Sequence, residues 1–474
     1  MAKQNYHVIL FPFPAHGHIT PHLALQARLH QYHPNLTITL VSTPRNIASI
    51  RSSLPPTSPL QLHSLPFCPA DYGLLSDSES TEDLPSGQFG TFLFALESVC
   101  PAFDHFITET SKQSSVCIIS DMLLGWTLDV AHKHHAFHSS FMGTSAFGGA
   151  VFLSVMMNLP HNHSDSDPLT LPEYPGVLVP RSQLAAHILT ASQTDPSTVL
   201  TQKLLSTLYK TDALLVNTTE YLDPIGICML KKTHNLPVIP IGPLVGSSYS
   251  SIPTSERESN IFEWLDLHPG ASVLYISFGS QDSIQKSQMM ELALGLEASG
   301  RPFIWVIRPP LGYNAKDEFK DEWLPDGFEK RMKEENRGFF VHGWAPQIAI
   351  LSHKSIGAFL SHCGWNSVLE SLNSGVPIIG WPLQAEQPFN VTLLVDLGVC
   401  VEVARGKLET SEVKKGKVAD TIEVVMGDNE KGQDMREKAN KISEMMKETW
   451  KGESCSSAKG LAELLKLIKR VTNN

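Results

Sequence analysis

Both halves of the 474-residue chain alternate between short apolar runs and longer amphipathic segments. The first half contains the runs HVILFP, LTITLVST, VCIIS, AFHSSF, ALLVN and PVIPIG, and the second half contains SVLYISFGS, FIWVI, GFFVHGW, GAFL, VPIIGWP and VCVEV. Short apolar runs bounded by Gly and Pro predict buried strands. Strands that alternate with helices predict parallel sheets with right-handed crossovers. The sequence therefore predicts an α/β fold built from doubly wound sheets.

The length of the chain predicts more than one domain, because 474 residues exceed what one ordinary core holds. The stretch GSSYSSIPTSERES has the polar composition of a linker. We therefore expect an N-terminal domain over residues 1–245, a linker over 246–259, a C-terminal domain over 260–450 and a last helical segment over 451–474.

Several segments within the domains carry weaker patterns. We expect a turn after the first strand, a helix from about Ile19 to His30 and a helical stretch over Gly87–Lys112. Leu159–Leu184 is rich in Pro, Asp, Ser and His and predicts a long surface loop. The charged stretch Arg308–Leu324 is expected to be mobile cover. Four clustered histidines lack a clear ligand spacing, so we expect them at a helix end and on a strand surface: His132, His134, His135 and His138.

Charge and cysteine usage exclude several classes of protein. The net charge is −11 and no block of Lys and Arg is present, which argues against nucleic-acid binding. The seven cysteines are scattered without a CxxC pair, which favours reduced thiols and gives no zinc-site spacing. No apolar run approaches the roughly 18 residues of a membrane span, and the first residues do not resemble a signal peptide. We expect a cytoplasmic, monomeric protein.

A tight turn in the second half has the features of an anion site. GAFL predicts a buried strand, SHCG a turn, and WNSVLESLNSG a helix that ends at Gly375. The N–H groups at the start of such a helix have no partner within the helix, and they point at one place. The turn is therefore suited to hold phosphate.

The turn lies within a 44-residue stretch, Trp344 to Gln387, that resembles the signature box of plant family-1 UDP-dependent glycosyltransferases. This resemblance implies the GT-B fold, in which two Rossmann-like domains face each other across a cleft. It also implies an acceptor-binding N-terminal domain, a donor-binding C-terminal domain and a last helix that packs back on the first domain. The UDP-sugar is then a co-substrate, and neither a cofactor nor a metal is expected.

The resemblance also implies a role for each residue of the donor site. Trp344 stacks on the uracil, the backbone of Ala345 and the side chain of Gln347 reach the uracil edge or the ribose, and Glu370 accepts from the ribose hydroxyls. The diphosphate is assigned to the helix amides with Gly279, Ser280, His362, Gly364, Asn366 and Ser367. The transferred sugar is assigned to Trp365, Glu386 and Gln387, with a hydroxyl from Thr144.

Two positions of the box refine the expected donor. Relatives more often carry Asp where Glu386 stands, which keeps the carboxylate and lengthens its reach. Gln387 is associated in the family with glucose donors. Trp381, by contrast, is expected to be a core anchor.

A histidine and a carboxylate follow two strands of the first half. His16 and His18 lie after the first strand, and Asp121 directly follows VCIIS. The residues alone leave open a helix cap or an exposed histidine, and an N-cap role for the aspartate. The family has a P-x-x-G-H-x-x-P turn and an S/A-D strand end, which implies that His18 is the general base and Asp121 its partner. The sequence departs from the family at His16, which could line the acceptor pocket or act as a competing base.

The acceptor site is expected in the N-terminal domain. Phe13, Phe141 and Met142, together with loops near Leu74–Phe89 and Leu159–Leu184, are apolar or aromatic in character. This character suits a flat or polycyclic molecule such as a flavonoid, another phenolic or a terpenoid. We expect direct displacement with inversion, from UDP-glucose to an acceptor hydroxyl.

Three other functions remain open. A C-glycosyltransferase acting on an aromatic acceptor would use the same base. An NAD(P)-dependent oxidoreductase fits the alternation, but neither half carries G-x-G-x-x-G after its first strand. A non-catalytic UDP-sugar-binding protein would keep the box and lose the base.

Overall fold

The computed structural model describes residues 6–85, 87–246, 256–281, 283–313, 317–406, 412–452 and 455–471. The chain forms two compact units. The first unit comprises Met1–Arg181, Thr190–Tyr249 and Thr449–Asn474, and the second comprises Ser182–Leu189 and Ser250–Glu448. Most of the predicted linker, from residue 247 to residue 255, lies outside the described residues.

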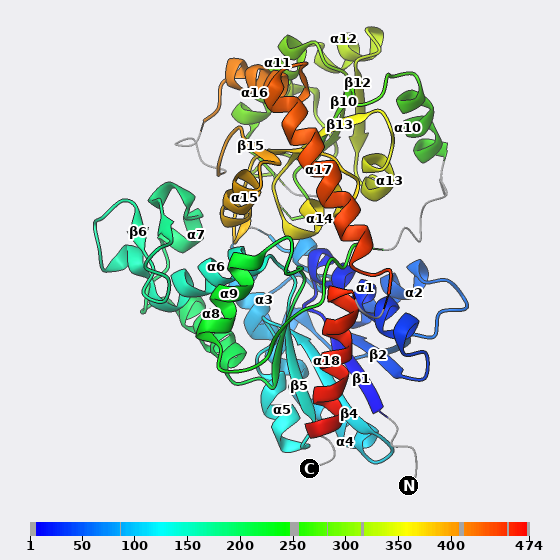
Figure 1. Cartoon of the computed structure of the whole chain (residues 1–474), viewed down its shortest axis with the longest axis vertical. Coiled ribbons are helices and arrows are strands. Elements are labelled where there is room, and N and C mark those ends of the chain that lie inside the picture. Colours follow the sequence, from blue (N-terminus) through cyan, green and yellow to red (C-terminus); the bar gives the residue numbers. More distant parts are fainter. Residues whose placement is uncertain are drawn as a thin grey trace. The chain divides into compact units, whose positions relative to one another are not determined.

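The first unit is built on a parallel sheet of seven strands in the order β3-β2-β1-β4-β5-β8-β9 (Figure 1). The strands are β1 (Tyr6–Phe11), β2 (Thr37–Ser42), β3 (Gln61–Ser64), β4 (Ser115–Asp121), β5 (Phe137–Met142), β8 (Ala213–Val216) and β9 (Val238–Pro240). The sequence predicted all of them except β3, whose residues QLHS are too polar to stand out from a loop.

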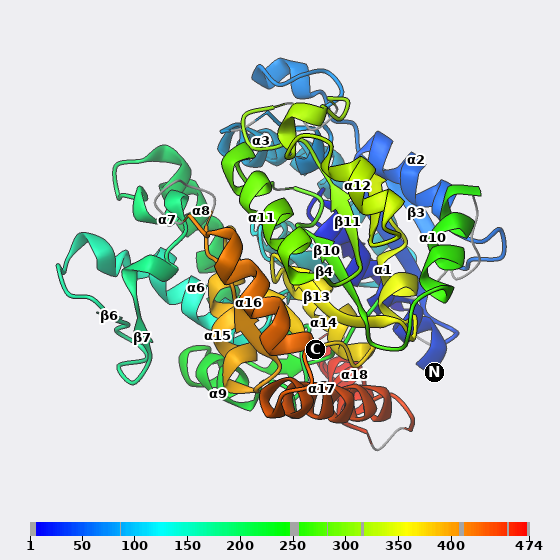
Figure 2. The same cartoon turned by 90° about the horizontal axis from the view of Figure 1, so that it is seen from above.

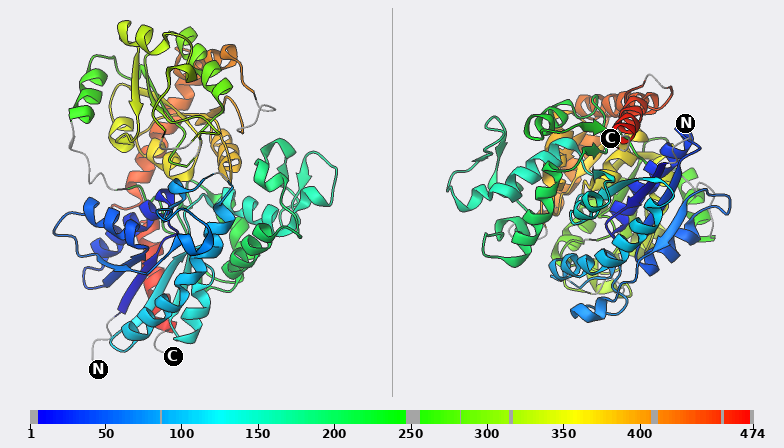
Figure 3. Two further views of the ribbon diagram at one scale, coloured as in Figure 1. Left: turned by 180° about the vertical axis from the view of Figure 1, so that it is seen from behind. Right: turned by 90° about the horizontal axis from the view of Figure 1, so that it is seen from below.

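Helices cover both faces of this sheet because successive strand residues point to opposite sides. Val8 and Leu10 share one core with α1 (His16–Tyr32), α2 (Pro44–Ser53) and the C-terminal helix α18 (Ser456–Val471). Ile9 and Phe11 share the other core with the helices of the opposite face, which Figure 3 shows from behind. These helices are α3 (Phe89–Ala95), α4 (Cys100–Ser111) and α5 (Thr127–Lys133). The remaining helices of the first unit are α6 (Ala146–Asn158), α8 (Pro196–Ser206) and α9 (Pro224–Thr233).

The second unit is built on a parallel sheet of six strands in the order β12-β11-β10-β13-β14-β15. The strands are β10 (Val273–Ser277), β11 (Phe303–Ile307), β12 (Gly338–His342), β13 (Ile356–Ser361), β14 (Ile378–Gly380) and β15 (Cys400–Glu402). The helices are α7 (Ala186–Leu189), α10 (Glu256–Asp266), α11 (Lys286–Ser299), α12 (Phe328–Glu334), α13 (Gln347–Leu351), α14 (Trp365–Asn373), α15 (Gln387–Asp396), α16 (Lys415–Met426) and α17 (Glu430–Glu448).

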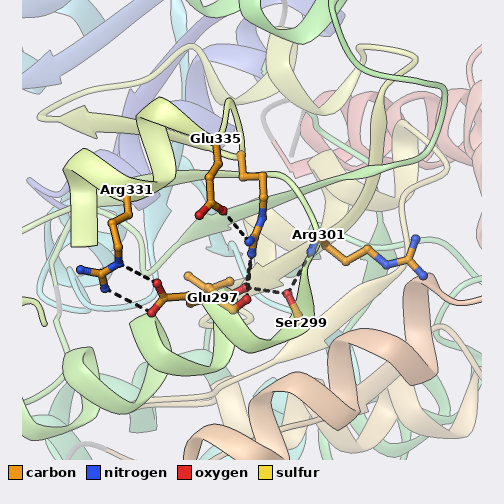
Figure 4. Close-up of polar contacts among 7 residues, drawn as sticks. Glu297, Ser299, Arg301, Arg331 and Glu335 are labelled. Atoms are coloured by element: carbon orange, nitrogen blue, oxygen red, sulfur yellow. Dashed lines mark hydrogen bonds and ion pairs between the residues drawn. The ribbon is translucent and has the colours of Figure 1, made fainter. Parts of the chain in front are cut away.

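The core of the second unit lies between its sheet and the neighbouring helices α11 and α16, which run side by side (Figure 2). Trp381 is fully buried there, as predicted for a core anchor. The C-terminal end of α11 is held by charged groups (Figure 4). Arg331 of α12 donates from Nε to Glu297 Oε1 at 2.8 Å and from Nη2 to Glu297 Oε2 at 3.3 Å. This bidentate pair fixes α12 against α11.

Four sequence-based expectations about local structure are wrong. The helix expected from Ile19 begins earlier, at His16, so His16 and His18 lie in its first turn. The stretch Gly87–Lys112 is interrupted near Pro101 into α3, a short 3₁₀ segment and α4. Leu159–Leu184 contains a small antiparallel hairpin, β6 (Leu169–Thr170) with β7 (Leu178–Val179). Its apolar side chains are buried beneath it: Leu169, Leu171, Tyr174 and Val179. Trp323 and Leu324, at the end of the expected mobile cover, belong to the core.

The expectation that His138 lies on a strand surface is also wrong. His138 lies in β5, an internal strand of the sheet, and is fully buried. Its Nδ1 lies 2.8 Å from Thr211 Oγ1, and its Nε2 lies 3.1 Å from Ser120 Oγ and 3.0 Å from Thr127 Oγ1. Hydroxyl groups satisfy both ring nitrogens, so the burial of this polar ring is tolerated.

Candidate catalytic and donor-binding residues

The catalytic candidates of the first unit lie where the strand order of its sheet reverses. From β1 the chain proceeds to β2 and β3 on one side, and from β4 it proceeds to β5, β8 and β9 on the other. Phe11, at the end of β1, is in register with Ser120 of β4, and Asp121 is in register with Phe141 of β5. The residues that follow these three strands therefore share one edge of the sheet, the usual place for a ligand in a doubly wound fold.

His18 and Asp121 form a hydrogen-bonded pair at this edge. His18 Nδ1 lies 2.7 Å from Asp121 Oδ2, and the His18 side chain is 31% exposed whereas that of Asp121 is 1% exposed. Burial acts to raise the pKa of Asp121. The charge and hydrogen bond of His18 outweigh burial, so the pKa is lowered, and His22 and the Leu123 N–H add smaller effects in the same direction. An ionised carboxylate only accepts, so Nδ1 carries the proton that it receives. In the neutral imidazole the lone pair then lies on Nε2, which suits a general base.

Two neighbouring rings support the pair. The ring of Phe13 lies 5.4 Å from that of His18 at an angle of 67°. His22, one turn further along α1, donates from Nδ1 to the carbonyl oxygen of His18 at 2.8 Å. Burial lowers the pKa of His22 to about 4, so its ring is neutral near pH 7. The sequence reasoning missed His22, although its spacing of four residues from His18 on a helix was visible.

The predicted acceptor residues separate into buried and exposed groups. Phe13 and Phe141 are each 1% exposed and Met142 is 0% exposed. These three side chains fill the core and offer no surface to an acceptor, so their predicted contact with it is not supported. Phe141 and Met142 lie in β5, whose sheet is covered on both faces, and Phe13 packs against the rings of Phe89 and Phe92. His16, in contrast, is exposed.

An aromatic side chain in the predicted acceptor loop is accessible. Phe89 is 45% exposed, and its ring lies 5.9 Å from that of Phe13. Phe13 in turn contacts the ring of His18. A chain of ring contacts through Phe13 therefore connects the accessible Phe89 with His18.

Thr144 follows β5 at the same edge as Asp121. Ser145 caps helix α6 by accepting from the N–H of Gly148 at 2.8 Å. Thr144 Oγ1 is buried and has no hydrogen-bond partner among the described residues. A buried hydroxyl of this kind costs free energy unless a ligand satisfies it, which fits the predicted role of Thr144 in donor binding.

The donor candidates of the second unit also lie where the strand order reverses, here between β10 and β13. Ser277 at the end of β10 is in register with Ser361 of β13, and Ser361 is in register with Gly380 of β14. Gly279 and Ser280, the turn after Ser361 and the segment from Trp381 to Gln387 therefore follow three adjacent strands. This edge carries most of the residues that the sequence assigned to the diphosphate and the sugar.

The phosphate turn consists of His362, Cys363 and Gly364. Cys363 has a φ of 62°, and its N–H donates to Ser361 Oγ at 3.0 Å. The carbonyl oxygen of Cys363 accepts from Asn390 Nδ2 of α15 at 3.0 Å. Helix α14 begins directly after Gly364, a residue whose lack of a side chain leaves the turn itself to shape the start of the helix. The positive end of α14 therefore lies at this turn, and such an end is suited to an anion.

His362 faces this turn as a neutral ring. Burial lowers its pKa to about 4. Near pH 7 the ring is therefore uncharged and carries a single N–H, and a hydrogen bond with the backbone of Ser277 acts against the effect of burial on its pKa. The positive end of α14 and the backbone amides remain to stabilise the charge of a leaving diphosphate.

Gln347, Ser367 and Glu370 form one hydrogen-bonded group. Gln347 Nε2 donates to Glu370 Oε2 at 2.7 Å and to Ser367 Oγ at 3.0 Å. Tyr275 donates from its hydroxyl to Gln347 Oε1 at 3.3 Å, which orients the amide. Burial raises the pKa of Glu370 to about 7, against the opposing effect of its hydrogen bond with Gln347. The structure therefore brings together the two side chains that the sequence assigned to the ribose.

The tryptophans of the box differ in exposure. Trp344 is 66% exposed, an unusual state for so large an apolar ring and one that suits stacking on a base. Ala345 is buried beside it. Trp365 is 3% exposed, so its ring offers almost no surface to a sugar and only its backbone is suited to the predicted contact.

Glu386 and Gln387 stand at the start of α15. Gln387 Oε1 accepts from the N–H groups of Leu383 and Gln384 at 2.9 and 3.0 Å. Its amide nitrogen is therefore the group that can face a sugar. Glu386 Oε1 accepts from Asn390 Nδ2 at 3.4 Å, the same amide that holds the phosphate turn. The sugar and phosphate positions are thus linked through Asn390, which the sequence reasoning did not identify.

Two parallel α/β sheets, each with candidate residues at its strand-order reversal, fit the GT-B fold of glycosyltransferases, and comparison with known proteins shows this class. The family model described as UDP-glucoronosyl and UDP-glucosyl transferase matches residues 250–447. UDP-glycosyltransferase 92A1 of Arabidopsis thaliana is 39% identical to the chain, and the alignment covers 99% of each. The chain belongs to the plant family-1 UDP-dependent glycosyltransferases.

Solved structures extend the similarity to both units. The structure of Glycyrrhiza uralensis UGT73P12 complexed with glycyrrhetinic acid 3-O-monoglucuronide matches with a TM-score of 0.84 at 28% identity, covering 98% of this chain and 96% of that one. The structure of Medicago truncatula UGT71G1 complexed with UDP-glucose matches with a TM-score of 0.79 at 27% identity, covering 99% and 98%. Among the described residues, no helix is both long enough and apolar enough to cross a membrane.

Proposed function

We propose that the chain transfers glucose from UDP-glucose to a hydroxyl of a small apolar or aromatic acceptor, with inversion at the anomeric carbon. His18 removes the proton of the hydroxyl as its oxygen attacks, and Asp121 holds the imidazole in the productive tautomer. UDP leaves toward the phosphate turn and the N-terminus of α14. The 2.7 Å hydrogen bond between His18 and Asp121 is the observation that carries this proposal.

The donor assignment rests on the second unit. The Trp344 ring, the Gln347–Glu370 pair and the start of α14 match the chemistry of a uracil, a ribose and a diphosphate respectively. Glucose is favoured by Gln387 and by the similarity to a protein solved with UDP-glucose. The acceptor class is supported by the exposed Phe89 beside Phe13. The first unit would bind the acceptor and the second the donor, in a monomeric cytoplasmic enzyme.

The base assignment is tested by comparing His18→Ala with His16→Ala. Transfer from UDP-glucose to a mixed panel of flavonoids, other phenolics and terpenoids is followed by mass spectrometry, with UDP affinity measured by calorimetry. We expect His18→Ala to lose transfer by at least about 10³-fold while UDP affinity is retained, because His18 lies in the other unit from the nucleotide residues. His16→Ala should lose far less. Near-native transfer by His18→Ala to an unactivated alcohol would contradict the proposal.

The stereochemistry and the bond type are tested on the product. The proton coupling of the anomeric centre should indicate a β-linked sugar from the α-linked donor, as inversion requires. Acid should release the sugar from an O-linked product, whereas a C-linked product would survive. Repeating the panel with UDP-galactose and UDP-xylose measures the preference for glucose.

A further inference from the structure

The helix that carries His18 lacks a cap of its own. Helix N-termini leave N–H groups without partners, which a side chain at the N-cap position usually satisfies. The N-cap residue of α1 is Ala15, which has no side-chain acceptor. The N-cap residue of α2 is Thr43, and its side chain makes no capping hydrogen bond. Both helix starts must therefore obtain acceptors from elsewhere in the chain.

An acidic segment, Asp77–Asp83, supplies these acceptors. Glu82 Oε1 accepts from the N–H of His16, the first residue of α1, at 2.8 Å across 66 positions of sequence. Glu79 Oε2 accepts from the N–H of Arg45, in the first turn of α2, at 2.8 Å. The acidic segment thus provides one carboxylate for each helix.

The acidic segment is fixed to the same two helix starts by its backbone. The N–H of Thr81 donates to the carbonyl oxygen of Pro14 at 3.1 Å. Asn46 Nδ2 donates to the carbonyl oxygen of Glu79 at 2.7 Å. Ser80 Oγ also donates to Glu82 Oε2 and orients that carboxylate. Glu82 is therefore held in place rather than free to sample solvent.

The two capped helices differ in what their first turns carry. The first turn of α1 carries His18, which becomes an imidazolium when it takes a proton, whereas the described part of α2 carries no residue assigned to the reaction. The positive end of a helix disfavours a cation in its first turn, and a carboxylate at that end counteracts the effect. The same kind of cap can therefore have a chemical consequence in α1 and only a structural one in α2.

We propose that Glu82 is a positioning residue for the base: it sets the start of α1, and thereby the place of His18, and its charge favours proton uptake by His18. This inference rests on the proposed role of His18. Among the described residues, Asp121 of β4 pairs with His18, His22 of α1 donates to its carbonyl oxygen, and His16 lies in the same first turn of α1. Partial burial lowers the pKa of His16 and the Glu82 charge opposes it, which indicates that this charge acts at the start of α1.

The test compares Glu82→Gln with Glu79→Gln. Both variants keep an acceptor oxygen and remove one charge from the same segment, but only Glu82 caps the helix of the base. Without the Glu82 charge the imidazolium is less stabilised, so His18 loses its proton at lower pH. We expect the acidic limb of the kcat/KM profile to move to lower pH by about 0.2–0.7 unit, with a fall of about twofold on the plateau. Glu79→Gln should leave the limb in place.

A second measurement does not depend on glycosyl transfer. The imidazole signal of His18, assigned by its loss in His18→Ala, is titrated by NMR in the wild-type protein and in both variants. A shift in Glu82→Gln alone supports the proposal even if His18 proves not to be the base, in which case the transfer assay of His18→Ala fails separately. Equal shifts in both variants, or no shift in either, would overturn the role of Glu82. Glu82→Ala, which also removes the acceptor, should lower kcat further with little change in the KM for UDP-glucose.

Discussion

The backbone of Gly279 lies against the imidazole of His362, so that a Cβ at residue 279 would stand 2.7 Å from Nε2 of the ring. Gly364 approaches the same ring from its own side, with a corresponding distance of 2.5 Å. Both distances are shorter than any van der Waals contact allows. The two glycines therefore confine the histidine of the phosphate turn, and this explains why SFGS and HCGW carry glycine at these positions.

Gly279→Ala should weaken UDP binding, by about 10-fold or more, because His362 must move out of the phosphate turn. The backbone of Gly279 has a φ of 80°, so alanine also adds conformational strain there. Gly300→Ala is the matched control, since Gly300 has a φ of 66° but nothing lies within 4 Å of its added Cβ. Calorimetry with UDP should show the loss only in Gly279→Ala. Equal losses would attribute the effect to backbone strain alone.

Asp121→Asn should lower kcat by about 100-fold, and by less than His18→Ala, because the base stays present without the group that holds its tautomer. Asp104→Asn is the control, since Asp104 Oδ1 forms a comparable pair with His134 Nε2 at 2.8 Å in the same unit. Initial rates at saturating UDP-glucose measure both variants. Similar losses in the two would indicate damage to the fold of the unit rather than to the base.

The pH dependence of nucleoside binding should report on Glu370. Its pKa is raised to about 7 by burial, so the carboxyl is largely protonated at pH 6 and largely ionised at pH 8. Ribose hydroxyls donate best to the ionised form. Uridine, which lacks phosphates that titrate in this range, should bind up to about tenfold more tightly at pH 8 than at pH 6.

Glu370→Gln should remove most of this dependence, as measured by NMR titration with uridine at both values of pH. His362 does not interfere, because burial lowers its pKa to about 4 and the ring is neutral throughout. Equal affinities of the wild-type protein at pH 6 and pH 8 would show that Glu370 does not receive the ribose in its ionised form.

Asp223 should make the first unit less stable as the pH rises toward neutrality. Its Oδ1 accepts from the N–H of Gly226 at 3.0 Å and its Oδ2 from that of Phe147 at 2.9 Å, so it caps α9 and the start of α6. Burial raises its pKa to about 7, above the unfolded value of about 3.9. The folded state therefore holds a proton that the unfolded state has lost, and stability declines between about pH 4 and pH 7.

In Asp223→Asn the free energy of unfolding, measured with urea, should differ less between pH 5 and pH 8 than it does in the wild-type protein. Asp223→Ala should lower this free energy by about 2 kcal/mol, because both caps are lost. Asp195→Asn is the control. Asp195 caps α8, and hydrogen bonds from Ser197 and Thr198 lower its pKa to about 2, so its contribution is the same at pH 5 and pH 8. If the free energy of unfolding of Asp223→Asn fell between pH 5 and pH 8 as much as that of the wild-type protein, Asp223 would not be the cause of the decline.

The strands of both sheets except the polar β3 could be predicted from the sequence, because each of the others is a short apolar run that identifies itself locally. The order of the strands could not, yet it is the order that places His18 beside Asp121 and Gly279 beside His362. The sequence pattern placed these residues near the ends of predicted strands, as they are in the structure, and the resemblance to the family implied their roles. It did not identify His22, Asn390 or Glu82, since none of them belongs to a recognisable motif.

Residues that the sequence placed wrongly share a physical cause. Phe141, Met142 and His138 were assigned to a pocket or a surface, but β5 is an internal strand covered on both sides, so every one of its residues is buried. Helix α1 was expected to begin at Ile19, but it extends to His16, where the carboxylate of Glu82 supplies the missing cap. Burial and capping depend on partners that are distant in sequence.

The sequence by itself determined the alternation of strands and helices, the family, and the identity of the residues in the donor box, because these depend on neighbours within a few positions. The tertiary structure alone decided which side chains are accessible, which charges face each other and where α1 begins. Those properties depend on contacts between segments that are distant in sequence, such as 77–83 and 16–18, and a local sequence pattern does not predict such contacts.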